Sequence, residues 1–139
     1  MDNKVKVLLV DDNEVIRMIF SNIFWLHGLD EQYELATVAR IEDARARIDD
    51  PTTRPAIVFT GLVMPFEKSG KISPSAEAGF SLISYIKQNP TLNHIRVIVF
   101  SGYNDDALKE KSLALGAEQY LKKDENIPQD IISIIRASH

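Results

Sequence analysis

The fold is decided by residues 56–65, which read Ala56-Ile57-Val58-Phe59-Thr60-Gly61-Leu62-Val63-Met64-Pro65. The apolar run at 57–59 predicts a strand covered on both faces, as in parallel sheets. Gly61 follows this strand directly, and Pro65 prevents a helix from starting at once. Ligands of open parallel sheets bind in the crevice beyond the carboxyl ends of the strands. We therefore expect Gly61, which has no side chain, to lie on the floor of such a crevice.

The rest of the chain alternates between two kinds of pattern. Apolar segments at 5–10, 95–100 and 118–121 and an alternating segment at 32–38 predict four more strands. Apolar residues at helical spacing predict helices over 14–27, 41–50, 79–89, 105–115 and 127–135. Five strands alternating with five helices predict an α/β fold with a doubly wound parallel sheet and helices on both faces. We expect a single domain over residues 1–139.

Composition limits the function classes. The chain has 139 residues, of which 45% are hydrophobic and 26% charged, as in globular domains. A net charge of −4 argues against nucleic acid as a direct partner. Without cysteine there is no disulfide or thiolate metal site. No segment approaches the ~20 apolar residues of a membrane span, so we expect a cytoplasmic protein without a membrane partner.

The first predicted helix is more apolar than one buried face requires. Its expected core stripe at helical spacing consists of Val15, Ile16, Ile19, Ile23 and Leu26. The aromatic residues Phe20, Phe24 and Trp25 fall beside this stripe. They are candidates for a partner or homodimer surface, the alternative being aromatic residues that flank a wide core helix.

Polar residues follow three of the predicted strands. Asp11 and Asp12 end the first, Ser101 ends the fourth and Lys123 ends the fifth. Two adjacent carboxylates suit Mg²⁺, and a hydroxyl with an ammonium suits a phosphoryl oxygen. Alternatively, the aspartates cap a helix and Lys123 neutralises them. Because parallel topology brings all these strand ends to one edge, we prefer the functional interpretation.

Four motifs occur in a fixed order: Lys6-Val7-Leu8-Leu9-Val10-Asp11-Asp12-Asn13, Val63-Met64-Pro65, Val97-Ile98-Val99-Phe100-Ser101-Gly102, and Gly116-Ala117 through Tyr120-Leu121-Lys122-Lys123. With them the chain resembles, over almost its whole length, the receiver domain of two-component response regulators. The resemblance implies a flavodoxin-like fold with strand order 2-1-3-4-5. It also implies a signalling module in a phosphorelay, rather than an enzyme.

The resemblance also assigns roles and partners. In this family a sensor histidine kinase or phosphorelay protein passes a phosphoryl group to an aspartate at the end of the third strand, and the receiver then acts on an output protein. Carried over, Asp11 and Asp12 hold Mg²⁺, together with the backbone carbonyl of Val63. Ser101 is the switch hydroxyl, Lys123 pairs with the phosphoryl group, and Tyr120 is the aromatic switch.

The central departure from the family is Gly61. The acceptor aspartate lies four residues before the proline of the family's Met-Pro pair, and Gly61 occupies that position here. Glycine has no nucleophile, so no acyl phosphate can form on it, and Mg²⁺ loses one carboxylate ligand. Strand alternation points the neighbouring Thr60 to the opposite side. Either the domain works naturally without phosphoryl transfer, or a working receiver has lost its aspartate; both remain open.

Two further departures concern loops. Residues 66–78 extend the usual short connection by roughly ten residues. We expect a loop there, either a disordered surface segment or one whose Lys68 and Lys71 reach over the acidic site. Asp124 stands where the family usually has proline, so the loop after Lys123 is expected to sit differently.

Two functions from other classes are weighed against a receiver. A small Mg-dependent phosphohydrolase on a similar fold needs a second acid two residues after its nucleophilic aspartate, and Asp11-Asp12-Asn13 lacks that spacing. A flavin-phosphate binder needs a hydroxyl- and amide-rich loop after the first strand, whereas this loop is acidic.

Overall fold

A computed structural model describes residues 4–103, 105–123 and 127–137. Its centre is a five-stranded parallel sheet of order β2-β1-β3-β6-β7. These strands are β1 (Val5–Val10), β2 (Tyr33–Val38), β3 (Ile57–Thr60), β6 (Arg96–Ser101) and β7 (Gln119–Lys122). The helices are α1 (Glu14–Leu26), η1 (Leu29–Glu31, a 3₁₀ turn), α2 (Ile41–Asp49), α3 (Glu77–Lys87), α4 (Asp106–Leu115) and α5 (Ile127–Arg136).

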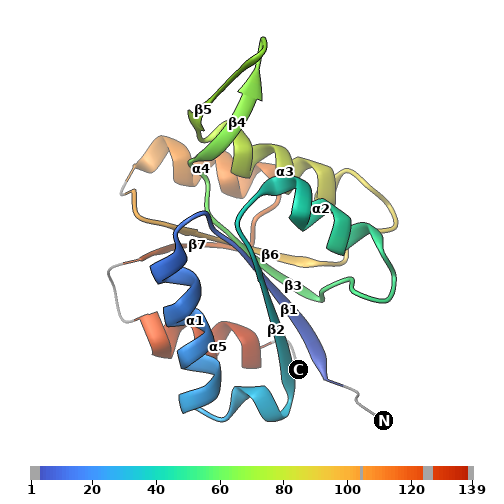
Figure 1. Ribbon diagram of the computed structural model, residues 1–139, viewed down its shortest axis with the longest axis vertical. Coiled ribbons are helices and arrows are strands. Elements are labelled where there is room, and N and C mark those ends of the chain that lie inside the picture. Colours follow the sequence, from blue (N-terminus) through green and yellow to red (C-terminus); the bar gives the residue numbers. More distant parts are fainter. Residues whose placement is uncertain (1–3, 104, 124–126, 138–139) are drawn as a thin grey trace.

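The helices cover both faces of this sheet. Helices α1 and α5 pack on one face, and α2, α3 and α4 on the other (Figure 1). The predicted α/β class, the five parallel strands and the five α-helices are confirmed. The sheet strands are numbered 2-1-3-6-7 because two additional strands follow β3. No helix in the described part of the chain combines the length and apolar character needed to cross a membrane.

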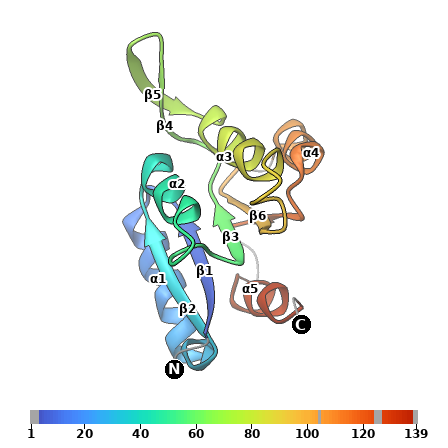
Figure 2. The same cartoon turned by 90° about the vertical axis from the view of Figure 1, so that its right-hand side faces the viewer.

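The prediction of a loop at 66–78 is wrong, because these residues form most of a hairpin. Strands β4 (Met64–Lys68) and β5 (Lys71–Ser75) form an antiparallel hairpin that projects from the body of the domain (Figure 2). At its tip Ser69 and Gly70 both have positive φ, 56° and 78°. Positive φ at both central residues is what a two-residue hairpin turn of type I′ requires. The next helix, α3, therefore begins at Glu77, two residues earlier than expected.

The buried face of α1 also differs from the prediction. Phe20 and Phe24 are buried in the core, whereas Val15 and Leu26 of the expected stripe are 60% and 68% exposed. The ring of Phe20 packs edge-on against Phe59 and Phe100, with centroids 5.1 and 5.3 Å apart. The helix thus turns its two phenylalanine rings toward the sheet, where they bury a large apolar area, whereas Trp25 is exposed. The proposal of Phe20 and Phe24 as a partner surface is therefore wrong.

Arg96 in β6 connects the sheet both to the residue before β7 and to α5. The guanidinium of Arg96 pairs with Glu118, and its Nη1 donates to the carbonyl of Ile134 at 2.8 Å. The hydrogen bond from Arg96 holds the pKa of Glu118 below the ordinary value of a glutamate. We expect Glu118→Gln to lower the free energy of unfolding by only about 0.5–1 kcal/mol at neutral pH, because the pair is partly solvated.

The same prediction has a pH dependence. A folded pKa below the unfolded value means that the stabilisation is complete above the unfolded pKa and is lost as the pH falls through the folded one. Urea unfolding of wild type and Glu118→Gln should therefore show a difference at neutral pH that disappears in strong acid. A difference that persisted in acid would mean that the carboxylate charge contributes nothing.

Candidate functional site

The ends of four strands bring the expected site residues together. Asp11 follows β1, Gly61 follows β3, Ser101 ends β6 and Lys123 follows β7. The ammonium Nζ of Lys123 lies 2.6 Å from Oδ2 of Asp11. The backbone N–H of Lys123 donates to the carbonyl of Ser101 at 3.0 Å. Residues up to 112 positions apart in the sequence thus share one edge of the sheet.

The carboxylate of Asp11 is the buried charge of this site. The residue is 1% exposed, and Oδ1 accepts a hydrogen bond from the N–H of Asn13 at 2.9 Å. Oδ2 is in contact with Lys123 but accepts no hydrogen bond within the described residues. The Lys123 side chain is 23% exposed, with Nζ 5.8 Å from the ring centroid of Phe100. A buried carboxylate of this kind depends on its cation.

The space beside Asp11 is where a side chain at position 61 would point. The N–H of Gly61 donates to the carbonyl of Val10 at 2.9 Å, and its φ lies outside the left-handed region. An added Cβ would lie 3.6 Å from Oδ2 of Asp11 and 3.8 Å from Sδ of Met64, both ordinary contacts. Neither the backbone nor the packing therefore requires glycine here. The hydroxyl of neighbouring Thr60 is buried and donates to the Gly61 carbonyl at 2.8 Å.

The two polar residues that follow Asp11, Asp12 and Asn13, have different roles. The side chain of Asn13 caps α1, accepting from the N–H groups of Val15 and Ile16 at 2.9 and 3.3 Å. This satisfies two donors of the first turn. The side chain of Asp12 is exposed and makes no ion pair within the described residues. It is therefore open to a ligand at the mouth of the site.

The two expected switch residues, Ser101 and Tyr120, both form hydrogen bonds with the backbone of Tyr103, which lies between β6 and α4. Ser101 is buried, and its hydroxyl oxygen accepts from the N–H of Tyr103 at 3.1 Å. The hydroxyl of half-buried Tyr120 donates to the carbonyl of Tyr103 at 2.6 Å. The sequence did not identify Tyr103, because both hydrogen bonds use its backbone atoms and backbone contacts leave no sequence motif.

The lysines of the hairpin do not join this site as a lid. Nζ of Lys68 lies 3.3 Å from Oε1 of Glu77, and the hairpin projects away from the strand ends (Figure 1). Lys71 stands opposite Lys68 in the hairpin register. The expectation for Asp124 concerns a residue outside the described part of the chain.

The residues present fit a divalent cation, but in competition with Lys123. Two carboxylates, a backbone carbonyl and water form a donor set that Mg²⁺ accepts. The buried Oδ2 of Asp11, with no hydrogen bond in the described residues, offers a lone pair to a cation. The ammonium 2.6 Å away already neutralises that oxygen. In the same residues no cluster of three or more acidic, histidine or cysteine side chains gathers as a metal site.

A second glycine supports the floor of the site. The N–H of Gly79 donates to the carbonyl of Leu62 at 3.0 Å, and a Cβ there would lie 2.5 Å from the carbonyl oxygen of Gly61. We expect Gly79→Ala to lower the free energy of unfolding by about 1–3 kcal/mol, because backbone would have to move. The matched control is Gly61→Ala, whose Cβ meets nothing closer than 3.6 Å and should cost far less. Chemical denaturation of both variants tests this order, and equal losses would contradict it.

Sequence comparison places these features in a family. The family model of the response regulator receiver domain matches residues 7–136. The transcriptional regulatory protein YdfI of Bacillus subtilis is 31% identical over 119 residues, which are 86% of this chain and 48% of that protein. The chain thus spans about half the length of this curated relative.

Solved structures agree on the fold. The chemotaxis response regulator CheY4 of Vibrio cholerae has a TM-score of 0.76 at 21% identity, over 99% of this chain and 100% of that one. The Mn²⁺-bound form of response regulator Rcp1 has a TM-score of 0.70 at 22% identity, over 96% of this chain and 90% of that one. With the family model matched from β1 to α5, the chain belongs to the response regulator receiver domain family, the receiver domains of two-component systems.

Proposed function

We propose that this chain is a receiver-type signalling module that takes no phosphoryl group at the end of β3, because Gly61 occupies the acceptor position. The observation that carries this proposal is the place of Gly61. Its missing side chain would point beside Asp11, with Cβ 3.6 Å from Oδ2, at the edge of the sheet that Lys123 and Ser101 also reach. An acyl phosphate needs a carboxylate there, and glycine supplies none.

Mg²⁺ binding is weakened for two reasons. Asp11, Asp12 and the Val63 carbonyl would hold the ion, but the carboxylate of an acceptor is missing. Lys123 also sits 2.6 Å from the oxygen that the ion needs. When bound, Mg²⁺ neutralises phosphoryl oxygens during transfer. Here Lys123 supplies a resident positive charge to Asp11 instead, so the Asp11 carboxylate is neutralised without metal.

The output of the module is a change in partner binding. Ser101 and Tyr120 both hydrogen-bond to Tyr103, so the segment that leads into α4 is coupled to the bottom of the site. A partner that moves Tyr103 would shift both side chains, and a change at Ser101 would be transmitted outward. We propose a sensor histidine kinase or phosphorelay protein and an output protein as the partners. No feature of the described site supports the alternative of a Mg-dependent phosphohydrolase.

The test is incubation of the wild-type chain with acetyl phosphate and Mg²⁺, followed by intact-mass measurement. We expect the unmodified mass alone, before and after the donor is added. A stoichiometric phosphoryl adduct mapped to the residues around β3 would overturn the proposal. Circular dichroism spectra recorded with and without the donor are the control. Identical spectra show that the protein stays folded, so that the mass result reports the chemistry of the site.

A further inference from the structure

Strand β2 is an edge of the sheet with its outer side uncovered. Within the described residues its one strand neighbour is β1 (Figure 2). The N–H of Val5 donates to the carbonyl of Gln32, and that of Asp11 to the carbonyl of Val38. Alternate residues of a strand present their backbone to the same side, so the even positions of β2 bond to β1. Leu35 and Thr37 therefore direct their N–H and C=O groups outward.

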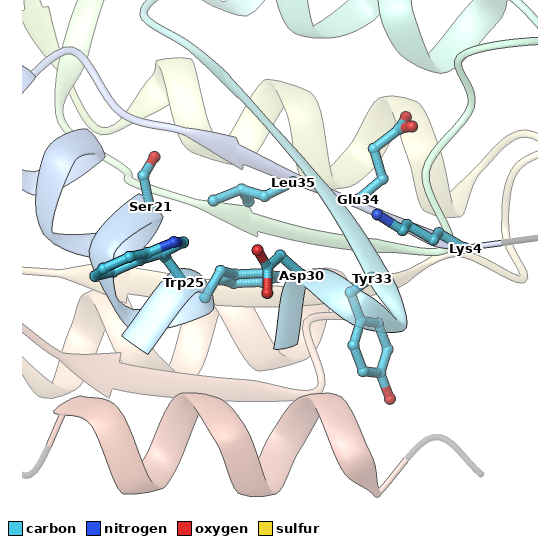
Figure 3. Close-up of a pocket in the computed structure, with 8 residues that line it drawn as sticks. Lys4, Ser21, Trp25, Asp30, Tyr33, Glu34 and Leu35 are labelled. Carbon is cyan, nitrogen blue, oxygen red and sulfur yellow. The ribbon is translucent and has the colours of Figure 1, made fainter. Parts of the chain in front are cut away.

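Three separate hollows lie along this edge, between β2 and the neighbouring helices. One hollow, of about 310 Å³, is lined by Trp25 and Leu35 (Figure 3). The next, of about 330 Å³, contains Met18 and Thr37, and a third, of about 520 Å³, contains Thr37 and Arg47. Trp25 and Met18 are 70% and 58% exposed, so large apolar side chains flank open backbone groups. Exposed edges of this kind accept a further strand.

We propose that the β2 edge pairs antiparallel with β2 of a second copy of this chain, across a twofold axis at Ala36. Leu35 of each copy then lies opposite Thr37 of the other, and these two pairs exchange four hydrogen bonds. The two Ala36 residues form the close, non-hydrogen-bonded pair between them. A methyl side chain suits the short Cα separation of such a pair, about 4.5 Å.

Charge favours a second copy over an unrelated peptide. The hollow at the start of β2 contains Lys4, Asp30 and Glu34, and the hollow at its end contains Arg17, Asp43 and Arg47. The lining of the first hollow thus has more acidic than basic side chains, and the lining of the second has more basic than acidic ones. Antiparallel pairing places the first hollow of each copy against the second hollow of the other, which makes the edge complementary to itself.

One pair of charges can be assigned from the register. Glu34 lies opposite Val38 of the second copy, and side chains at even positions of β2 share one face. Ala36 and Val38 pack on the core cluster that contains residues of α2. Arg47 is exposed on α2 and lines the same hollow as Val38. Glu34 of one copy therefore faces Arg47 of the other, twice in each dimer.

Sedimentation velocity over a concentration series tests this interface by charge reversal. We expect a wild-type dimer whose dissociation constant rises at least about tenfold in Glu34→Arg and in Arg47→Glu, because each creates two like-charge contacts. The double variant should return to within a few-fold of wild type. Glu110→Lys, an exposed reversal on α4, is the control and should change nothing. A double variant no tighter than the single ones would overturn the proposal.

A backbone variant tests the strand pairing itself. Thr37→Pro removes an outward N–H and leaves the hydrogen bonds to β1, and proline is tolerated on edge strands in that position. We expect a monomer with an unchanged circular dichroism spectrum, whereas Thr37→Val stays dimeric. A folded Thr37→Pro dimer would overturn the proposal. So would a wild-type chain that stays monomeric up to about 1 mM, including one that instead binds an added extended peptide at this edge.

Discussion

Replacing Gly61 with aspartate should give a chain that takes one phosphoryl group from acetyl phosphate in the presence of Mg²⁺. The backbone tolerates a side chain there, since φ is not left-handed and the added Cβ meets Asp11 Oδ2 at 3.6 Å. The new carboxylate adds a ligand for Mg²⁺ next to Asp11, and it competes with Asp11 for Lys123. Intact-mass measurement should change from no adduct in wild type to a stoichiometric adduct in the variant.

The chemistry of that adduct supplies its controls. A carboxylate oxygen attacks phosphorus while the bond between phosphorus and the acetate leaving group breaks, so the product is an acyl phosphate. Hydroxylamine should remove it, and Gly61→Asn, which has the same shape without the nucleophile, should not form it. An adduct in Gly61→Asn would place the modified residue elsewhere. A folded Gly61→Asp variant that stays unmodified would show that position 61 is not the phospho-acceptor position.

The parallel sheet could be predicted because its three central strands, β1, β3 and β6, are short, mostly apolar runs bounded by turn residues. Burial on both faces leaves this pattern in the sequence even without alternation. The hairpin β4–β5 escaped prediction because its residues are mostly exposed, as Ile72 illustrates at 71%. Its tip also needs positive φ at Ser69, a residue that gives no such signal. Strand pairing there depends on backbone geometry, which composition does not reveal.

The inward face of α1 was predicted from periodicity alone, and periodicity allowed two answers. Residues 15, 19 and 26 lie on one side of the helix, and residues 16, 20, 23 and 24 on another. The sheet beneath α1 carries Phe59 and Phe100, which offer Phe20 edge-to-face contacts. Tertiary partners decided between the two faces, and they cannot be read from the helix itself.

The site was more predictable than the helix face, because topology alone brings strand ends together. Asp11 and Lys123 lie in contact for that reason. The supporting parts were not predictable. The close approach of Gly79 to Gly61 and the hydrogen bonds to Tyr103 depend on how α3 and the β6–α4 segment pack.

Lys123→Met should lower the free energy of unfolding by roughly 3 kcal/mol, because it removes the ammonium that pairs with the buried Asp11 carboxylate. Asp11 is 1% exposed and cannot recover the lost interaction from water. Methionine keeps the apolar length that packs near the ring of Phe100, so the change is mainly one of charge. Urea unfolding measures the loss, and Lys109→Met, at an exposed position on α4, is the matched control.

The same variant separates the two cations that compete for Asp11. Without the ammonium 2.6 Å from Oδ2, added Mg²⁺ should stabilise Lys123→Met measurably more than wild type, since binding to the folded state raises stability by mass action. Combining Lys123→Met with Asp11→Asn removes the buried charge and should restore most of the stability, with no response to Mg²⁺. A double variant as unstable as the sum of the single ones would mean that Lys123 acts through packing, and that the pair with Asp11 does not hold the site together.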